Sequence, residues 1–496
     1  MNALAKILAW PAEDDDLLGL ALWDAVEIAR AVRGVAVGQF QVSGVEIDSR
    51  DVVPGDLFFA LKGEAMDGHK FVAMAFARGA AAVVVDRPVD GPHVLVDDTS
   101  IALELLAKAA RRRTAAQIIG VTGSVGKTGV KEAIFAALDR SSRGQAHRSV
   151  KSYNNHVGVP LSLARMPARA KFGVFEMGMN HAGEIAALTR QVRPNVAVIT
   201  TIAPAHIEML GSEEAIADAK AEIFEGLEPG GIAIVPADSP HYDRLKGAAD
   251  RLGVVLQSFG RAAHATVRLL DAVPAPDGGS LITADLGDRR ICYTVAEPGE
   301  HWIVNSLAVM AAVRAAGGDL GAAGLALAEM QGLKGRGART VLTVRGGDGS
   351  GQALLIDESY NANPASMRAT LAQLGKTPAR RRIAVLGAMK ELGELGPAFH
   401  AALIEPLMAA QIDRAILVGD EMRVLADELG KPGHSLLGKP PAFAHCGTAR
   451  EALERLRELG VEGGDAILVK GSNSVGLGTL VAALVQDKDW HQACCT

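Results

Sequence analysis

One short segment constrains the fold of this chain more than any other. Residues 118–121 form an apolar run that is short enough for a buried strand. They lead into Thr122-Gly123-Ser124-Val125-Gly126-Lys127-Thr128, after which a helical pattern begins. A strand, a glycine-rich loop and a helix in this order bind phosphates, because glycines let backbone N–H groups approach phosphate oxygens. The segment therefore predicts an α/β sheet with a phosphate site at the end of one strand.

The last two residues of this loop carry the predicted chemistry. Lys127 can reach the outer phosphates of a nucleotide, and the Thr128 hydroxyl can hold Mg²⁺. The loop is shorter than the usual phosphate-binding pattern, because Val121 stands where that pattern has a glycine. A glycine-rich turn without a ligand is the alternative. The agreement of strand, turn, Lys-Thr pair and helix favours the phosphate site.

Length and composition place the chain among multidomain globular proteins. Its 496 residues are too many for one hydrophobic core, so about three domains are expected. The net charge of −6 offers no basic surface for nucleic acid, and no apolar run approaches the ~20 residues of a membrane span. The four cysteines do not suggest a disulfide framework, and the first residues lack a signal-peptide pattern. We therefore expect a cytoplasmic protein without nucleic acid partners or membrane spans.

Short apolar strands alternate with helical segments along the chain, which predicts parallel α/β architecture. The alternation breaks at residues 86–93 and again at 332–337. We therefore place domains at residues 1–98, 99–335 and 336–496. Two segments rich in Gly, Asp and Pro, residues 271–280 and 346–352, are typical of hairpin loops.

Polar residues follow two further apolar runs of the middle domain. Residues 172–175 end at Glu176, residues 196–199 lead to His206, and Lys220 lies in the next helical pattern. Taken singly, these residues read as a helix cap, a turn histidine and a solvated lysine. Ligands gather at the carboxyl ends of parallel strands, and Mg²⁺ prefers oxygen ligands and phosphates. Beside a phosphate loop, the group therefore predicts a Mg²⁺–nucleotide site.

The last domain repeats the alternation and predicts a doubly wound sheet. Four apolar runs each end in small or polar residues: 354–356, 383–386, 415–418 and 466–469. No Gly-x-Gly-x-x-Gly motif follows any of them, so a dinucleotide site is not indicated. For most of these individual residues, a structural role in the loops at strand ends is as good an explanation as a functional role.

Along nearly its whole length the chain resembles the Mur ligases of bacterial cell-wall synthesis. The shared segments are residues 122–128, Glu176-Met177-Gly178, Ala205-His206-Ile207-Glu208, 220–224, His301-Trp302-Ile303-Val304-Asn305, Gly335-Arg336 and Lys470-Gly471-Ser472. Within the family, the N-terminal segments are most similar to the members that add D-alanyl-D-alanine to UDP-N-acetylmuramoyl-tripeptide. These segments are residues 48–50, 54–64 and 67–69, and residues 357–364 agree with them.

The resemblance implies a fold and a reaction. It implies a uridine-nucleotide-binding α/β domain, a central P-loop ATPase-like parallel sheet and a C-terminal Rossmann-like doubly wound sheet. The reaction would use ATP to convert the tripeptide carboxylate to an acyl phosphate, which the amine of D-alanyl-D-alanine attacks. We expect a monomer that needs ATP and a pair of Mg²⁺ ions.

The resemblance also implies roles for individual residues. The catalytic group would be Lys127, Glu176, His206 and Lys220, with Thr128, Glu176, His206 and Lys220 holding metal. The lysine at the position of Lys220 is carbamylated by CO₂ in related ligases. The nucleotide would contact Gly123, Ser124, Gly126, Lys127, Thr128, Asn305, Arg336 and Asp357. The UDP-linked acceptor would contact Ser49, Arg50, Lys62, Asn154 and Asn155.

The chain departs from the family pattern in three places. Thr200 or Thr201 stands where an asparagine is frequent, Asn473 replaces an arginine after Lys-Gly-Ser, and Glu358 replaces a commoner aspartate.

Three alternative functions remain to be weighed. The first is a sibling ligase that adds diaminopimelate or lysine to the dipeptide acceptor, but its Asp-Asn-Pro-Arg motif is absent. The second is a folate–glutamate ligase, which would lack the uridine-binding domain. The third is a non-enzymatic nucleotide-binding scaffold, which would not need Glu176, His206 and Lys220 together.

Overall fold

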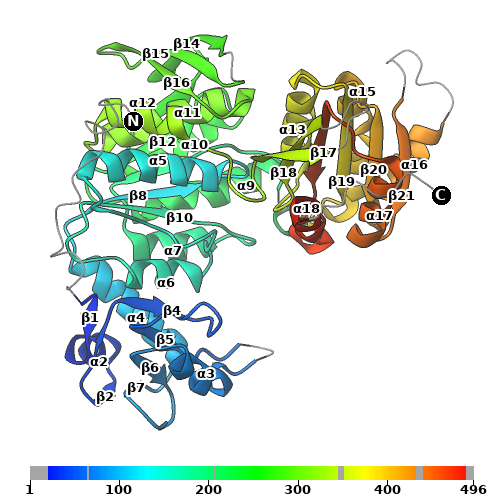
Figure 1. Cartoon of the computed structure of the whole chain (residues 1–496). Helices are drawn as coiled ribbons and strands as arrows, with labels where there is room; N and C mark the ends of the chain where they lie inside the picture. The colour runs from blue at the N-terminus through cyan, green and yellow to red at the C-terminus, as the bar shows by residue number, and fades with distance from the viewer. Residues whose placement is uncertain are drawn as a thin grey trace, which may run out of the picture. The chain divides into compact units, whose positions relative to one another are not determined.

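The fold is described from a computed structural model, shown in Figure 1. It describes residues 21–63, 66–205, 207–275, 278–344, 351–431 and 440–486. The chain forms two compact units. The first contains the residues up to Ala116 together with His147–Phe175, and the second contains Gln117–Ala146 and the residues from Glu176 onward. The first unit is therefore made of two separate stretches of chain.

The first unit is a small α/β domain. The strands of its main sheet lie in the order β2-β7-β6-β5-β4. Their bounds are β2 (Val35–Val37), β7 (His93–Leu95), β6 (Ala82–Val85), β5 (Asp56–Phe59) and β4 (Gly44–Glu46). All neighbours are parallel except β2 and β7. A separate antiparallel pair joins β1 (Trp23–Asp24) and β3 (Gln41–Val42).

Side chains on β5 alternate between two cores, one on each face of this sheet. Leu57 and Phe59 lie in one core, and Phe58 lies in the other. This follows from the two-residue period of a strand. The larger core also contains residues of α2 (Ala25–Val32), α4 (Thr99–Arg112) and α6 (Gly158–Ala164), whereas the smaller contains residues of α3 (Val72–Ala77), which follows the 3-10 turn η2 (Gly68–Phe71). Helices cover both faces of this sheet. Most side chains of its strands are therefore buried and apolar, as is typical of parallel sheets.

The first sheet of the second unit carries the phosphate loop. Its strands in this unit lie in the order β16-β15-β14-β13-β12-β11-β8. They are β8 (Gln117–Thr122), β11 (Val196–Ile199), β12 (Ile232–Pro236), β13 (Val255–Gly260), β14 (Val267–Pro274), β15 (Ser280–Asp285) and β16 (Arg290–Val295). Pairing is parallel from β8 to β14 and antiparallel from β14 to β16. The predicted parallel sheet therefore has an antiparallel extension.

The helices that accompany this sheet are α5 (Lys127–Ser142), α7 (Glu184–Val192), α8 (Ile207–Leu210), α9 (Glu213–Ala221), η3 (Glu222–Gly226), α10 (Tyr242–Leu252), α11 (Glu300–Ala315) and α12 (Leu320–Glu329). Two strands, β9 (Ala146–Arg148) and β10 (Phe172–Glu176), run across the chain boundaries between the units.

The second sheet of this unit is doubly wound. Its strand order is β17-β18-β22-β19-β20-β21, and only β17 is antiparallel to its neighbour. The strands are β17 (Ala338–Val344), β18 (Gly351–Glu358), β22 (Asp465–Lys470), β19 (Arg381–Gly387), β20 (Arg414–Val418) and β21 (Ala442–Cys446). The helices are α13 (Pro364–Lys376), η4 (Gly393–Leu395), α14 (Gly396–Ala401), α15 (Ile404–Ala409), η5 (Asp420–Met422), α16 (Arg423–Gly430), α17 (Ala449–Leu459), η7 (Asn473–Val475) and α18 (Leu477–Gln486). The fold class expected from the sequence is confirmed.

The strands that flank both predicted hairpin loops pair, although residues 276–277 and 346–350 of these loops lie outside the described residues and Gly351 and Gln352 belong to β18. β14 pairs antiparallel with β15, and β17 with β18. The first connection is shorter than residues 271–280, because pairing continues to Pro274 opposite Ser280. The domain boundaries placed at 98/99 and 335/336 stay predictions. None of the helices in the described part of the chain has the length and apolar character of a membrane-spanning helix.

Candidate nucleotide and acceptor sites

The phosphate loop lies between β8 and α5, as the sequence predicts. Gly123 has φ of 147° and Gly126 has φ of 86°, conformations that other residues rarely adopt. Gly126 occupies the N-cap position of α5 and provides no side-chain cap. The first N–H groups of the helix are therefore left for an anionic ligand.

Residues beyond β11 hold this loop in place. Ser124 donates its N–H to Thr201 O over 2.7 Å and its hydroxyl to Ala203 O over 2.8 Å. The Thr200 hydroxyl donates to Val125 O at 2.6 Å. A Cβ on Gly123 would lie 1.9 Å from the Thr200 oxygen, so only glycine allows this approach. The threonine that departs from the family pattern thus secures the loop backbone.

Thr128 and Glu176 form a pair of oxygen ligands beside the loop. Both residues are buried, and the Thr128 hydroxyl donates to a Glu176 carboxylate oxygen over 2.8 Å. A hydroxyl, a carboxylate and phosphate oxygens are the donors that Mg²⁺ prefers. The pair therefore fits the predicted metal, although no group of three or more His, Cys, Asp and Glu forms a metal cluster among the described residues. His206 lies outside the described residues.

Two lysine amines of this site, the half-buried Lys127 and the buried Lys220, have lowered pKa values. Lys127 donates to Gly123 O over 2.6 Å. Burial lowers the pKa of Lys127 and Arg336 lowers it further, whereas the Glu176 carboxylate opposes the shift. Lys220 in α9 is 2% exposed, and burial lowers its pKa well below the ordinary lysine value, with a further contribution from the charge of Lys127. Burial therefore favours the neutral form of the Lys220 amine relative to an exposed lysine.

Asn305 lies against the phosphate loop. It belongs to α11 and is buried, and a Cβ on Gly126 would lie 3.0 Å from its amide nitrogen. One turn earlier, the Trp302 ring occupies the space that a side chain on Gly129 would need. The shared segment that contains Trp302 and Asn305 therefore packs on the start of α5.

Asp357 and Arg336 lie in a second cluster of predicted nucleotide ligands. One carboxylate oxygen of Asp357 accepts the Gly335 N–H at 2.8 Å, and the other accepts the Ser359 hydroxyl at 2.6 Å. The Arg336 guanidinium lies 4.2 Å from the centre of the Tyr360 ring. Asp357 thus holds the turn that presents Arg336.

Lys470 and Glu358 belong to this cluster, and the sequence assigned them no role. The Lys470 ammonium donates to Asn361 O over 3.0 Å and lies 3.4 Å from a Glu358 carboxylate oxygen. Lys470 is 2% exposed, and burial lowers its pKa while Glu358 opposes the shift. The sequence shows Lys470-Gly471-Ser472 only as a segment shared with the family. The contact of Lys470 with Glu358 arises from the pairing of β18 with β22, which places the two residues opposite each other.

The predicted acceptor residues lie in the first unit. Ser49 is buried, with its hydroxyl 3.4 Å from Met74 Sδ, and Arg50 is exposed. Asp48 accepts both the backbone N–H and the guanidinium of Arg50, and this hydrogen bonding lowers the pKa of Asp48 to about 2. The Asp48 carboxylate therefore fixes the turn that carries Ser49 and Arg50.

Lys62 belongs to a separate ionic cluster of that unit. It pairs with Asp86, whose backbone N–H donates to His69 Nε2 over 3.1 Å. The other ring nitrogen of His69 lies 2.6 Å from Asp67 Oδ1. The His69 ring therefore joins the segment after β5 to the segment after β6.

Asn154 and Asn155 lie in the turn before α6. The Asn155 side chain accepts the Gly158 N–H over 2.9 Å and the Val157 N–H over 3.3 Å. Asn155 thus shapes the entry to α6, and Asn154 beside it is half-buried.

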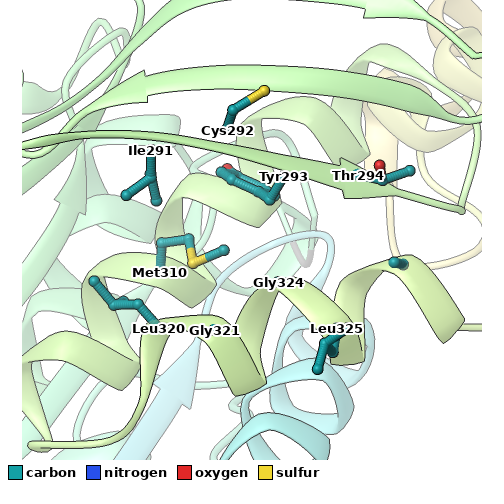
Figure 2. A pocket seen from close by; sticks show the side chains of 10 residues that line it. Ile291, Cys292, Tyr293, Thr294, Met310, Leu320, Gly321, Gly324 and Leu325 are labelled. Carbon is teal, nitrogen blue, oxygen red and sulfur yellow. The ribbon is translucent and has the colours of Figure 1, made fainter.

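A surface cavity of about 420 Å³ lies apart from these residues. It is lined by β16, α11 and α12, and Figure 2 shows the Cys292 sulfur pointing away from α12. Its lining is largely apolar and includes none of the predicted site residues. This cavity therefore gives no support to the predicted sites.

Comparison with known sequences identifies the family of the chain. Family models match residues 41–114 (Mur ligase family, catalytic domain), 121–313 (Mur ligase middle domain) and 342–473 (Mur ligase, glutamate ligase domain). A UDP-N-acetylmuramoyl-tripeptide--D-alanyl-D-alanine ligase from Synechocystis sp. is 35% identical over 463 residues, 90% of this chain and 93% of the relative. The chain belongs to the Mur ligase family.

Solved Mur ligase structures share the fold. MurF from Acinetobacter baumannii has a TM-score of 0.78 at 29% identity, covering 94% of this chain and 100% of that chain. The MurF ligase from Thermotoga maritima, solved in complex with ADP, has a TM-score of 0.69 at 26% identity, covering 89% and 97%. The three-domain Mur ligase architecture expected from the sequence is therefore confirmed.

We predict that Gly123→Ala weakens binding of an ATP analogue by at least about ten-fold, because the new methyl group displaces Thr200 and the loop that it holds. Isothermal titration calorimetry measures the change. Gly144→Ala is the matched control: Gly144 also has positive φ, 79°, but nothing lies within 4 Å of its added Cβ. Equal affinity of the two variants would contradict the prediction.

Proposed function

We propose that the chain is an ATP-dependent ligase that joins D-alanyl-D-alanine to UDP-N-acetylmuramoyl-tripeptide and releases ADP and phosphate. The observation that carries the proposal is the phosphate loop with its buried Thr128–Glu176 pair, in a chain whose relatives with that name match most of its length. The sibling reaction with diaminopimelate or lysine is less supported, because relatives that match about nine-tenths of the chain carry the D-alanyl-D-alanine name.

The proposed reaction has two steps. A carboxylate oxygen of the tripeptide attacks the γ-phosphorus of ATP, the bond from that phosphorus to the bridging oxygen breaks, and ADP leaves. The amine of D-alanyl-D-alanine then attacks the carbonyl carbon of the acyl phosphate, the carbon–oxygen bond to phosphate breaks, and the amine loses a proton. The protein contributes mainly by orienting the reactants and stabilising charge.

The residues of the second unit would perform the first step. The loop N–H groups and Lys127 would hold the β- and γ-phosphates and stabilise the charge that moves with the phosphoryl group. Asn305, Arg336 and Asp357 would hold the nucleoside part. Thr128, Glu176 and His206 would hold Mg²⁺, proposed as a pair of ions, which when bound neutralises charge on the phosphate oxygens.

Lys220 is proposed to act as a carbamate. Its amine lone pair would attack the carbon of CO₂, a proton would leave the nitrogen, and the product would be an anionic oxygen ligand. The near-complete burial of Lys220 and the lowered pKa of its amine support this step, because only the neutral amine reacts.

The residues of the first unit would bind the acceptor. Ser49, Arg50 and Lys62 would hold the UDP end, and Asn154 and Asn155 would face the sugar and peptide. The expectations of a cytoplasmic location and a monomer stay predictions.

The proposed reaction predicts phosphate release from ATP and Mg²⁺ only when both UDP-N-acetylmuramoyl-tripeptide and D-alanyl-D-alanine are present. Omitting each component in turn, with mass spectrometry of the pentapeptide product, tests this. Release that needs the dipeptide acceptor and diaminopimelate instead would replace the proposal by the sibling reaction.

We expect Lys127→Ala to reduce turnover by about 100-fold or more, because the transferred phosphoryl group loses its charged partner. Steady-state phosphate release measures the loss. Lys246→Ala, at a surface lysine of α10, serves as the control and should retain full activity. A loss of only a few-fold in Lys127→Ala would exclude the role.

Lys220→Ala should be inactive and should recover part of its activity when a short carboxylic acid is added, because the missing group is a carboxylate. Lys131→Ala removes another fully buried lysine and should show no rescue. Rescue is measured as phosphate release against acid concentration. Full activity of Lys220→Ala without added acid would rule out the carbamate.

A further inference from the structure

A buried ion pair in the first unit joins two segments that are distant in sequence. Glu46 is the last residue of β4, and Arg165 caps the C-terminal end of α6. One guanidinium nitrogen of Arg165 donates to a Glu46 carboxylate oxygen over 2.7 Å, and its Nε donates to Val45 O. The Arg165 and Glu46 side chains are only 21% and 6% exposed.

The second oxygen of Glu46 holds the start of the predicted UDP-binding turn. It accepts the N–H of Ile47 over 2.9 Å and the N–H of Asp48 over 3.3 Å. Asp48 in turn accepts the backbone N–H of Arg50 over 3.0 Å. The Glu46 carboxylate therefore connects Arg165 to the backbone that presents Ser49 and Arg50.

The other end of α6 carries the predicted sugar–peptide contacts. Asn155 accepts the Gly158 N–H at the first residue of the helix. Every residue of α6 from Gly158 to Ala164 is buried, and Leu161 and Ala164 belong to the main core of the unit. The helix is therefore a fixed spacer between Asn155 and Arg165.

We propose that Glu46 and Arg165 are positioning residues that set the UDP-binding turn and the Asn154–Asn155 turn at the spacing one acceptor molecule needs. This inference rests on the proposed function, because it takes the two turns to bind opposite parts of UDP-N-acetylmuramoyl-tripeptide. A ligand that contacts both turns loses affinity when their relative position is not held. UDP alone contacts only the first turn and is less sensitive.

The chemistry at this position requires an arginine. The planar guanidinium of Arg165 donates one hydrogen bond to Val45 O and another to Glu46. A lysine ammonium cannot reproduce this pair of donors in the same geometry. Asp56, a second buried carboxyl group, also faces this pair: burial raises its pKa, and Arg165 opposes that shift while Glu46 adds to it. Arg165 is thus the cation that pairs with Glu46 at the end of β4, and it also acts on Asp56 at the start of β5.

The test measures binding of UDP and of UDP-N-acetylmuramoyl-tripeptide to the full-length protein by calorimetry. For Arg165→Lys we expect the Kd of the complete acceptor to rise by about ten-fold or more, and the Kd of UDP by less than about three-fold. In steady-state assays the KM for the acceptor should rise by a similar factor, with kcat and the KM for ATP nearly unchanged.

Arg381→Lys is the matched control. Arg381 makes a forked pair with Asp465 at 2.8 and 2.6 Å, donates to Gly460 O, and its side chain is 20% exposed. It belongs to the second unit, whereas the predicted acceptor residues belong to the first. Thermal unfolding should show comparable destabilisation of both variants, but only Arg165→Lys should change acceptor binding.

Glu46→Gln provides an independent variant of the same size. It removes the charge that holds Ile47 and Asp48, so it should weaken UDP and the complete acceptor alike, by about ten-fold. If Arg165→Lys raises the Kd of both ligands equally, or of neither, the inference is overturned. Unchanged UDP affinity in Glu46→Gln would also overturn it. Wild-type protein that binds neither ligand would overturn the proposed function, and this inference with it.

Discussion

The phosphate loop takes its shape from the neighbouring strand, before any ligand binds. β8 and β11 are parallel neighbours with Thr122 opposite Ile199, so the residues that follow each strand meet at one edge of the sheet. Thr200 and Ser124 then exchange hydrogen bonds with the facing backbone. Because these hydrogen bonds fix the loop backbone without a ligand, little reorganisation of the loop would be needed when a phosphate binds. Any change in the β8–β11 register would move Thr200 away from Gly123 and break the hydrogen bonds that hold the loop.

The electrostatics of the second unit suit a polyanionic ligand. Lys127, Lys220 and Lys470 are amines whose pKa values are all lowered, mainly by burial. Glu176 opposes the shift at Lys127, and Glu358 opposes the shift at Lys470. Charge interactions gain strength where water is excluded, so a nucleotide phosphate chain would find its strongest partners here.

The sequence predicts elements whose signal is local and misses those that depend on tertiary pairing. The strand, loop and helix around residues 118–142 were expected because glycine conformation and apolar run length act within a few residues. A hairpin was expected near residues 271–280, but the further antiparallel strand β16 was not, since apolar alternation does not reveal strand direction. The hydrogen bonds of Asp357 to the turn at Gly335 arise from residues 22 positions apart, and a motif reading shows only that Asp357 follows a strand.

Glu46 and Arg165 illustrate the same limit more strongly. A glutamate at a strand end and an arginine at a helix end read as solvent-exposed residues. Their contact spans 119 positions, and only the packing of α6 on the sheet brings the two charges together. No pattern in either local segment contains that information.

The first unit has a consequence for synthesis of the chain on the ribosome. Its core contains Leu161 and Ala164, which are translated only after the whole β8–loop–α5 segment. A nascent chain that ends at Ala116 therefore has the strands of the unit's main sheet but lacks the α6 residues of its core. Domains fold as units during translation, so the first unit closes only when residues 147–175 have left the exit tunnel. The phosphate loop thus emerges while its N-terminal neighbour is still incomplete, and the order of folding differs from the order of the sequence.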